Sequence, residues 1–440
     1  YSFTFIFTFT ALINVKSLTQ NLLKHNILSL LCFSRCIMSK RTIEIIKISP
    51  CIIPDTKQHN RTPPRCCHLQ PDDYQEKFDF KTLSFDTFFS EKKVILSGPP
   101  LYGLEKFIKE GSFQLDQHDY SKHINVTHLD RTQCNHITHV EKQPHQLIWQ
   151  YEDVSIKTSV NNNFLNEFKG KKVLFTLSKN NKFEWIYDWI LFYKKYHDID
   201  NVLFYDNNSD HYTLDELKNY LTEKNLDVDI YLVPWNFKYG PQGGIYSGKG
   251  KTPWDSDFCQ YGMFEHAKYR FLKYATGVIN ADIDELIITP KQESIFKLLA
   301  NHKGLLYPSY WIQSIPLDPE KETRFFNYAY RSKTDRHTDY KWCINPSKLD
   351  DKIQWKVHSI RKTHLKCING VYYAHFKAIN YNWKTKRVDN ISFNNQTHYI
   401  DENVYTHLTQ LFPKNVPKII FQAHHVSFNV FRKLKSFFKS

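Results

Sequence analysis

Residues 276–290 read TGVINADIDELIITP, an apolar run that contains three acids. The apolar residues on both sides predict a buried β-strand, which Asp282, Asp284 and Glu285 interrupt. A buried carboxylate is unfavourable unless a cation or hydrogen-bond donors meet it. Acids placed where a hydrophobic strand emerges from a sheet therefore indicate a binding site.

The spacing of the two aspartates favours a metal. In an extended chain, residues two apart point to the same side, so Asp282 and Asp284 can face one hard cation while Ile283 packs into the sheet. Oxygen ligands suit Mg²⁺ or Mn²⁺, which take further ligands from substrate phosphates. An Asp-x-Asp pattern also occurs by chance at solvated strand ends, so its surroundings have to decide.

The composition is that of a globular protein with an excess of basic residues. The chain has 440 residues, enough for one large domain and a second region, and its formal net charge is +14. This charge favours anionic partners, namely nucleotide diphosphates, acidic glycans, anionic lipid or nucleic acid. The nine cysteines include no Cys-x-x-Cys pair, so we expect no disulfide framework and a cytoplasmic location.

The first segment, residues 1–37, is rich in Phe, Leu and Thr and precedes the first methionine, Met38. Lys16 and Lys24 interrupt its apolar run well before the roughly 18 residues of a membrane-spanning helix. Two interpretations stay open: translated sequence upstream of the true start, which we favour, and a weak hydrophobic leader. The segment is therefore excluded from the prediction of the fold.

Two regions of different character follow. Residues 38–165 contain strand-like stretches such as KVILS and VSIKTSV and predict a β-leaning accessory region. Over residues 166–400 strands such as KKVLFTLS, NVLFYD and VDIYLVPW alternate with amphipathic helices, which predicts an α/β domain with an open, mostly parallel sheet and flanking helices. Ligands bind beyond the carboxyl ends of such strands, where polar clusters at 178–180, 206–210 and 282–285 should converge.

Several of these segments together resemble one enzyme family. SKNNKFEWIYDWILFYKKYHDIDNVLFYDNNSD at 178–210, VPW at 233–235 and NADIDELI at 280–287 resemble, in this order, glycosyltransferase family 92 and related bacterial family-2-like proteins. The resemblance extends over about residues 172–387. It implies a GT-A fold, a nucleotide-sugar donor, with a UDP-sugar expected, and a Mn²⁺ or Mg²⁺ ion.

The resemblance also assigns roles on the donor side. Asp206 matches the position that contacts the nucleotide base or ribose, and Asn207 and Ser209 shape the turn around it. Lys179, after the first strand of the domain, is a further donor-binding candidate. Asn181 stands where the family usually has an acid, so this loop departs from the family pattern.

On the metal side, Asp282 and Asp284 match the motif that binds metal and diphosphate, with Asp284 as the direct ligand. Glu285 matches the acid after this motif, which positions the acceptor or supports the metal shell. The segment around His375 resembles the family's closing histidine segment, so His375 is a candidate metal ligand or diphosphate contact. His358, in a second such segment, is the weaker candidate, and a core histidine is the alternative for both.

The remaining site candidates are less well defined. Lys384 and Lys386, with Arg387, could neutralise a diphosphate leaving group, or could form a solvated helix face. Asp335 or Asp339 could deprotonate the acceptor if the reaction inverts configuration, and the sequence leaves both open. The Phe-Gly-x-x-Gly segment that the resemblance predicts after a tryptophan is replaced here by WIQSIPLD, residues 311–318.

Two further motifs have competing interpretations. GGIYSGK, residues 243–249, has the spacing of a phosphate-binding P-loop, but Gly250 occupies the Ser/Thr position and Pro253 discourages the helix that should follow. We interpret it as a flexible loop whose Lys249 and Lys251 could close over the donor. A second cluster that could bind zinc consists of Cys134, His136, His139 and His145. It has no second ligand pair at the spacing of a zinc finger, so we favour histidines at the surface.

The chain ends in a basic tail, residues 401–440. Its last residues, NVFRKLKSFFKS, form an amphipathic basic segment suited to an anionic membrane surface, or a terminal helix that docks on the body. The sequence thus predicts a metal-dependent glycosyltransferase, cytoplasmic or peripheral at the inner face of the membrane, with a glycan or glycolipid acceptor. A non-catalytic carbohydrate-binding protein and a nucleic-acid-binding protein are the alternatives, and the lack of a basic stripe interleaved with aromatics argues against nucleic acid.

Overall fold

The computed structural model describes residues 41–241, 254–337, 339–380 and 391–418. The described residues exclude the leader, the whole GGIYSGK loop with Lys249 and Lys251, the segment with Lys384, Lys386 and Arg387, and the end of the basic tail. Within the described ranges, no helix has both the length and the apolar character needed to cross a membrane.

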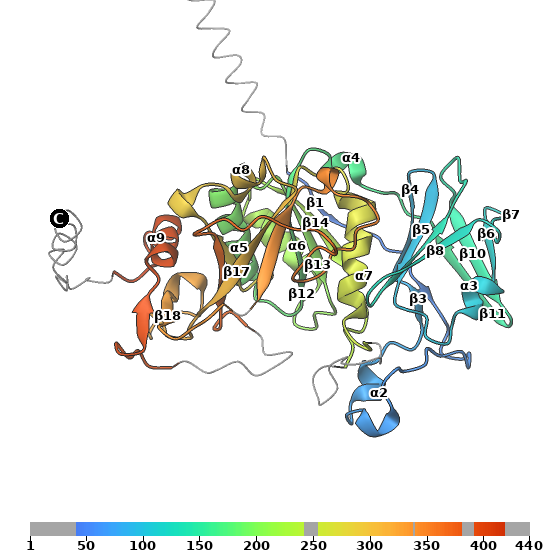
Figure 1. Cartoon of the computed structure of the whole chain (residues 1–440), viewed down its shortest axis with the longest axis horizontal. Coiled ribbons are helices and arrows are strands. Elements are labelled where there is room, and N and C mark those ends of the chain that lie inside the picture. Colours follow the sequence, from blue (N-terminus) through green and yellow to red (C-terminus); the bar gives the residue numbers. More distant parts are fainter. Residues whose placement is uncertain (1–40, 242–253, 338, 381–390, 419–440) are drawn as a thin grey trace, which may run out of the picture.

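The fold is built on one nine-stranded sheet with the order β1-β14-β13-β12-β15-β19-β17-β20-β16 (Figure 1). The first five strands in this order are parallel, and the pairs β15–β19, β19–β17 and β20–β16 are antiparallel. The predicted open, mostly parallel α/β sheet is therefore confirmed. The strands span β1 (Ile43–Ile45), β14 (Asp229–Pro234), β13 (Asn201–Asp206), β12 (Lys172–Ser178), β15 (Gly277–Asn280), β19 (Tyr340–Ile344), β17 (Gly304–Ile312), β20 (Tyr372–Phe376) and β16 (Glu285–Ile288).

Helices cover both faces of the parallel half, which is why its strands are nearly continuous apolar runs. α5 (Phe183–His197) and α6 (Leu214–Glu223) pack on one face through residues such as Leu174 and Phe204. α7 (Phe258–Ala267) and the π-helical turn η2 (Lys268–Leu272) pack on the other face through alternate residues of the same strands, such as Phe175 and Tyr205. Shorter helices are α4 (Leu165–Phe168), α8 (Ile295–Leu299), α9 (Glu402–Leu411) and the 3-10 turns η3 (Pro290–Gln292), η4 (Phe325–Asn327) and η5 (Pro346–Lys348).

The acidic stretch is not one extended strand. β15 ends at Asn280 and β16 begins at Glu285, and β19, β17 and β20 lie between them in the sheet. The chain crosses this distance through a turn in which the Glu285 N–H donates to the Asp282 carbonyl at 3.1 Å. The expectation of a single strand is therefore wrong, because the two apolar halves pair with different partner strands. A cation shared by Asp282 and Asp284 stays a prediction.

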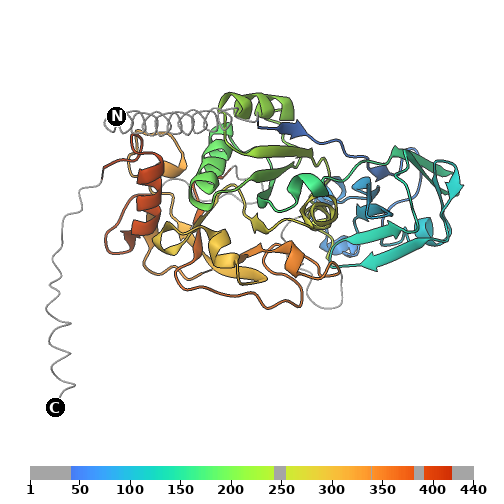
Figure 2. The same cartoon turned by 90° about the horizontal axis from the view of Figure 1, so that it is seen from above.

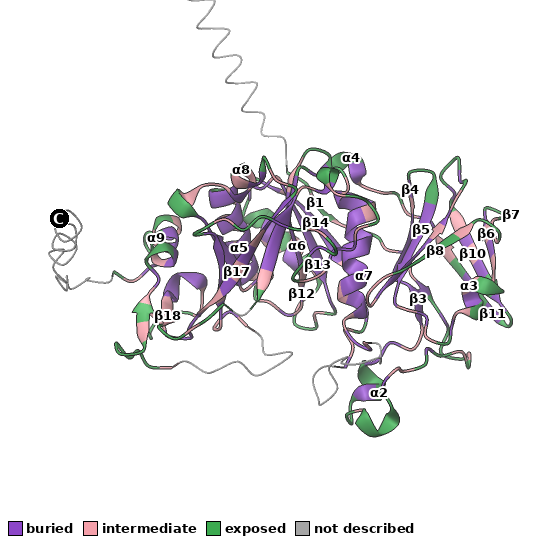
Figure 3. Cartoon of the chain, viewed as in Figure 1, coloured by how far each residue is buried: buried purple, intermediate pink, exposed green. Residues whose placement is uncertain are grey.

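The accessory region forms a separate set of β-sheets at one end of the molecule (Figure 2). Sheets β4-β5-β9-β8 and β11-β10-β6-β7 enclose a core of buried apolar residues such as Leu96, Phe113 and Trp149 (Figure 3). The β-leaning prediction for this region is confirmed, although its β1 extends the nine-stranded sheet. Its elements are β2 (Cys51–Ile52), η1 (Cys67–Leu69), α2 (Tyr74–Lys77), β3 (Thr82–Ser84), β4 (Asp86–Ser90), β5 (Lys93–Gly98), α3 (Lys106–Lys109), β6 (Ser112–Leu115), β7 (His118–Asp119), β8 (Ile124–His128), β9 (Gln133–Ile137), β10 (Gln146–Tyr151) and β11 (Val154–Ser159).

Buried polar bonds join the accessory region to the nine-stranded sheet. The Asp86 carboxylate of β4 accepts from Arg270 Nη1 of η2 at 2.6 Å and lies 2.9 Å from His266 Nε2 of α7. The other ring nitrogen of His266 lies 2.7 Å from the Tyr205 hydroxyl of β13. All of these side chains are buried, so the accessory region is bonded through α7 to the centre of the sheet.

Candidate functional site

Two of the predicted polar clusters lie at the same edge of the sheet. Ser178 at the end of β12 pairs with Asp206 at the end of β13, and β15 lies on the other side of β12. Neighbouring strands are about 4.8 Å apart, so β13 and β15 are separated by about 10 Å. The turn after β13 and the acids after β15 therefore face one region at the carboxyl ends of the strands.

Asp206 builds its own turn. Its carboxylate accepts from the Ser209 N–H at 3.0 Å, the Ser209 hydroxyl at 2.6 Å and the Tyr212 hydroxyl at 3.0 Å. Burial raises the pKa of Asp206, while these donors and the charge of Lys179 lower it. Asn207 donates to the carbonyls of Trp235 and Phe237, both at 2.8 Å, and so fixes this turn to the chain after β14.

A cavity of about 520 Å³ opens beside this turn. The rings of Phe183 and Tyr212 meet there with their centroids 5.0 Å apart. Asn180 bridges to Asp210, donating to its carboxylate at 2.8 Å and accepting its N–H at 2.9 Å. Polar side chains complete the lining: Asn181, Lys182, Glu184, His211 and Glu216.

The acids after β15 meet a histidine of β20. Glu285 and His375 lie in register across β16 and β20, and ligand atoms of Asp284, Glu285 and His375 all lie within 4.8 Å of one another. The His375 Nε2 is 3.1 Å from a carboxylate oxygen of Asp284, and the other side of its ring stacks on Trp311 at a centroid distance of 3.9 Å. We call Asp284, Glu285 and His375 the acid cluster.

Lys341 of β19 is a charged partner of these acids that the sequence analysis missed. Its ammonium is 2.9 Å from an Asp282 oxygen and 3.3 Å from a Glu285 oxygen, and its side chain is only 2% exposed. Burial lowers the pKa of Lys341, but the two carboxylates raise it by a larger amount. The net pKa lies above the usual value for lysine, so the ammonium stays charged. In YKWCI, residues 340–344, Lys341 lies two residues before the buried Cys343, so both side chains point to the same face of the strand. This spacing is the one sequence signal that indicates a buried lysine beside the acids.

The acid cluster is short of positive charge. Burial raises the pKa of Glu285 most, Lys341 lowers it, and Asp282 and Asp284 raise it, so that the net value is about 7. Asp282 itself is turned to Lys341 and is not part of the acid cluster, so the shared Asp282–Asp284 metal site stays a prediction. Two carboxylates and an imidazole form a donor set that fits Mn²⁺ or Mg²⁺.

The comparison with protein-family models adds the deciding observation. Residues 175–416 match the model described as glycosyltransferase family 92, and this range contains the Asp206 turn, the acid cluster and Lys341. The chain belongs to glycosyltransferase family 92. The predicted family and class of enzyme are thus confirmed, as the α/β fold class already was by the nine-stranded sheet with its flanking helices.

The other comparisons are weaker. The mannosyltransferase Ktr4p from S. cerevisiae is 12% identical, with a TM-score of 0.21 over 35% of this chain and 43% of that chain. An active-site mutant of LgtC is 14% identical, with a TM-score of 0.21 over 40% of this chain and 58% of that chain. The chain thus spans about half the length of these two proteins. No curated protein matches the sequence.

The two candidate bases of this family 92 chain have different surroundings. Asp335 accepts a hydrogen bond from the Gln313 side chain at 2.7 Å. Asp339 is exposed, its main chain pairs with Ser309 of β17, and its carboxylate makes no hydrogen bond or ion pair with any residue that the structure describes. Burial and the charge of Lys341 lower the pKa of His358, while the charges of Asp339 and Asp282 raise it. Because these charges act on His358, Asp339 and His358 lie close to Lys341 and Asp282.

Proposed function

We propose that the chain is a metal-dependent glycosyltransferase that moves a sugar from a nucleotide diphosphate, with a UDP-sugar expected, to a hydroxyl of a glycan or glycolipid. The acid cluster is the observation that supports the proposal best. It brings Asp284, Glu285 and His375 together beside Asp282, which follows β15, and β15 lies two strands from the Asp206 turn. Family membership supports glycosyl transfer in general, and the donor, acceptor and metal are our proposals.

Asp284, Glu285 and His375 would hold the Mn²⁺ or Mg²⁺ ion. When bound, this ion would neutralise the negative charge of the departing diphosphate. Lys341 holds Asp282 and Glu285 in place and supplies fixed positive charge beside the acids. Trp311 fixes the plane of the His375 ring by stacking on it.

The donor would lie between the acid cluster and the Asp206 turn. The cavity with the Phe183 and Tyr212 rings has the aromatic surface and amide groups that a nucleotide base needs. Asp206 contributes by holding Ser209 and Tyr212, with Lys179 as the nearby cation. The family resemblance implies that Asp206 contacts the base or ribose directly. We propose that Asp206 also positions Ser209 and Tyr212.

Asp339 is the better candidate for the base that removes the acceptor proton. An exposed carboxylate without a partner among the described residues can accept a proton, whereas Asp335 is occupied by Gln313. Lys384 and Lys386 as diphosphate contacts, and the basic tail as contact with an anionic membrane surface, stay predictions from the sequence. A cytoplasmic enzyme, peripheral at the inner face, and a part in polysaccharide biosynthesis also remain our proposals.

Donor hydrolysis is the direct test. The chain is incubated with UDP-sugars of several kinds and either Mn²⁺ or EDTA, and release of UDP is measured. We expect release with at least one donor in Mn²⁺, little in EDTA, and little from Asp284→Asn in either condition. UDP release from no donor, together with glycan binding that is indifferent to metal and to Asp284→Asn, would favour the non-catalytic carbohydrate-binding alternative.

A further inference from the structure

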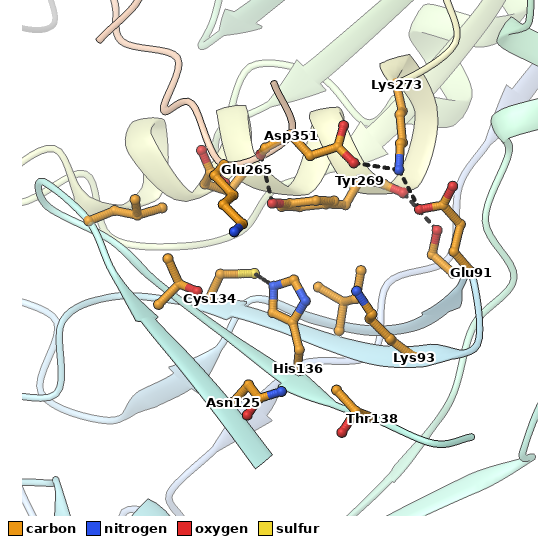
Figure 4. Close-up of a pocket in the computed structure, with 15 residues that line it drawn as sticks. Glu91, Lys93, Asn125, Cys134, His136, Thr138, Glu265, Tyr269, Lys273 and Asp351 are labelled. Carbon is orange, nitrogen blue, oxygen red and sulfur yellow. Dashed lines mark hydrogen bonds and ion pairs between the residues drawn. The ribbon is translucent and has the colours of Figure 1, made fainter. Parts of the chain in front are cut away.

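A second cavity, of about 330 Å³, lies between the accessory region and the α7–η2 helix (Figure 4). One wall is the sheet β4-β5-β9-β8 and the other is the helix surface with Glu265, Tyr269 and Lys273. η2 leads into the start of β15, whereas the acid cluster follows the end of β15. The cavity is therefore separate from the candidate active site.

The sheet wall combines polar residues with a small buried apolar cluster that includes Ile95 and Cys134, although a helix covers it. Ile95, His136 and Asn125 lie in one row across β5, β9 and β8, and Cys134 and Thr127 lie in the next row. The opposite face of the same strands carries the apolar core residues, such as Leu96. A sheet face that serves only to pack on a helix is expected to be apolar throughout, so the polar residues His136, Asn125 and Thr127 on this face suit a bound polar molecule.

His136 is one of the histidines expected on the surface, and the structure corrects that expectation. Its ring is largely enclosed in the cavity wall, 3.1 Å from the Cys134 sulfur, and burial lowers its pKa to about 4. The zinc interpretation gains no support, because no group of three metal ligands forms around Cys134 within the described residues. The alternation of β9 turns His136 to the helix and not to solvent.

A buried carboxylate oxygen in this cavity has no partner among the residues that the structure describes. Glu265 is 1% exposed, and its Oε2 accepts from Lys268 at 2.7 Å. Its Oε1 is buried and makes no hydrogen bond with any described residue. A buried acceptor is costly when it is left unpaired, so a donor such as a hydroxyl group is expected there.

The lining of the cavity carries three acids and three lysines, so its charges cancel: Glu91, Glu265, Asp351, Lys93, Lys273 and Lys352. Lys268 pairs with Glu265, and Lys273 pairs with both Glu91 and Asp351 at 2.6 Å. A free cation or a free anion therefore meets a like charge, whereas a neutral ligand with many hydroxyls can use both donors and acceptors. The Tyr269 ring adds an aromatic surface, and the volume lies within the usual range of ligand sites.

We propose that this cavity binds one sugar ring of a glycan, with a ring hydroxyl donating to Glu265 and the ring lying against Tyr269. Asn125 and Thr127 on β8, at the open side, contact the same sugar. The site would hold a glycan chain at the accessory region, away from the acid cluster. The proposal does not depend on transfer activity, because it rests on the cavity alone.

The test is saturation-transfer NMR of the full chain with glucose, galactose, mannose, fucose, N-acetylglucosamine and glucuronic acid. We expect a signal for at least one sugar that Asn125→Trp removes, because the indole fills the open side of the cavity. His128→Trp is the matched control, since His128 is exposed at the end of the same strand and does not line the cavity. Glu265→Gln should weaken binding about 10-fold or more, the loss of a charge-assisted hydrogen bond.

Two outcomes would overturn the proposal. No signal from any of the six sugars would show that the cavity holds only water. An equal signal from wild type and Asn125→Trp would place the sugar elsewhere. Binding of UDP with Mn²⁺ is measured on the same variants and should be unchanged in Asn125→Trp, so a failure of this site is distinguishable from a failure of the proposed transferase.

Discussion

Asp86 in the accessory region and Glu285 in the acid cluster are both buried carboxylates, but their surroundings are opposite. Asp86 lies where the accessory sheets meet α7 and η2, and both of its oxygens are saturated with donors. These donors are the main-chain N–H groups of Ser49 and Thr87 and the side chains of Asn161, His266 and Arg270.

Glu285 has far fewer donors and more negative neighbours. One of its oxygens accepts from the Asp282 N–H at 2.9 Å and lies 3.3 Å from Lys341, which Asp282 shares. Burial raises the pKa of both carboxyls, but Arg270 and His266 bring that of Asp86 down to about 2, whereas that of Glu285 stays at about 7. The saturated carboxylate holds the structure together, and the undersupplied one is suited to receive a cation.

The largest effect is expected at the saturated carboxylate. Asp86→Asn leaves the Arg270 guanidinium buried without its counter-charge, and breaking such a pair costs about 3–5 kcal/mol. Urea unfolding should show this loss. Asp153→Asn, at an exposed pair with Lys57, is the control with little change. A loss below about 1 kcal/mol for Asp86→Asn would contradict the structural role.

The buried imidazole of His197 makes the stability of the fold depend on pH. His197 is held neutral, because Nε2 is 3.0 Å from the Ile287 carbonyl and Nδ1 accepts from the Ile295 N–H at 3.3 Å. Burial lowers its pKa from 6.5 to about 3. The unfolded chain therefore takes up a proton first as the pH falls, so this contribution to stability is full above pH 6.5 and declines below it.

Between pH 6.5 and pH 5 this loss amounts to about 2 kcal/mol. His197→Gln lacks the titrating group, so its free energy of unfolding should fall less steeply with pH than that of the wild type. Urea unfolding at pH 7, 6 and 5 measures both slopes. Parallel slopes would show that the imidazole of His197 is not held neutral in the fold.

At the undersupplied carboxylate, stability and metal binding should separate. Glu285→Gln keeps the side-chain shape, and at pH 7 the carboxyl is already partly protonated, so the free energy of unfolding should change by less than about 1 kcal/mol. Mn²⁺ affinity, measured by electron paramagnetic resonance, should fall at least about 10-fold. A strongly destabilised variant with unchanged Mn²⁺ affinity would make Glu285 another structural carboxylate.

The smallest effect on stability is expected for an ion pair of similar length that is exposed to solvent. Lys92 and Glu141 form a 2.8 Å ion pair at the surface, with both side chains mostly exposed. Lys92→Met should leave the melting temperature unchanged within error, since exposed pairs are screened by water and salt. A clear drop in the melting temperature would mean that ion-pair distance, and not burial, governs stability in this protein.

Local pattern was enough to predict much of the fold. The apolar runs of β12, β13 and β14 and the amphipathic helices between them indicated a parallel sheet, and the polar residues after these strands indicated its functional edge. The break between β15 and β16 was not predicted, because apolar residues stand on both sides of the acids and only pairing with distant strands shows that they belong to two strands.

The site was predictable only where the chain carries a motif. Asp284, Glu285 and His375 were singled out in advance, and their grouping came from the register of β16 with β20. Lys341 was missed because a lone lysine in a short strand has no motif, and its meaning depends on the acids of another strand. His136 was misplaced because a polar sheet face is normally a solvent face, whereas here a helix covers it.

Titration calorimetry of UDP is the most direct test of the central claim that the acid cluster holds a cation for a nucleotide diphosphate. The wild type should bind UDP in Mn²⁺ and at least about 10-fold more weakly in EDTA, and Asp284→Asn in Mn²⁺ should behave like the wild type in EDTA. Asp339→Asn should bind UDP like the wild type, because the role that we propose for Asp339 is on the acceptor side. Equal UDP affinity with and without Mn²⁺, or in wild type and Asp284→Asn, would contradict the account.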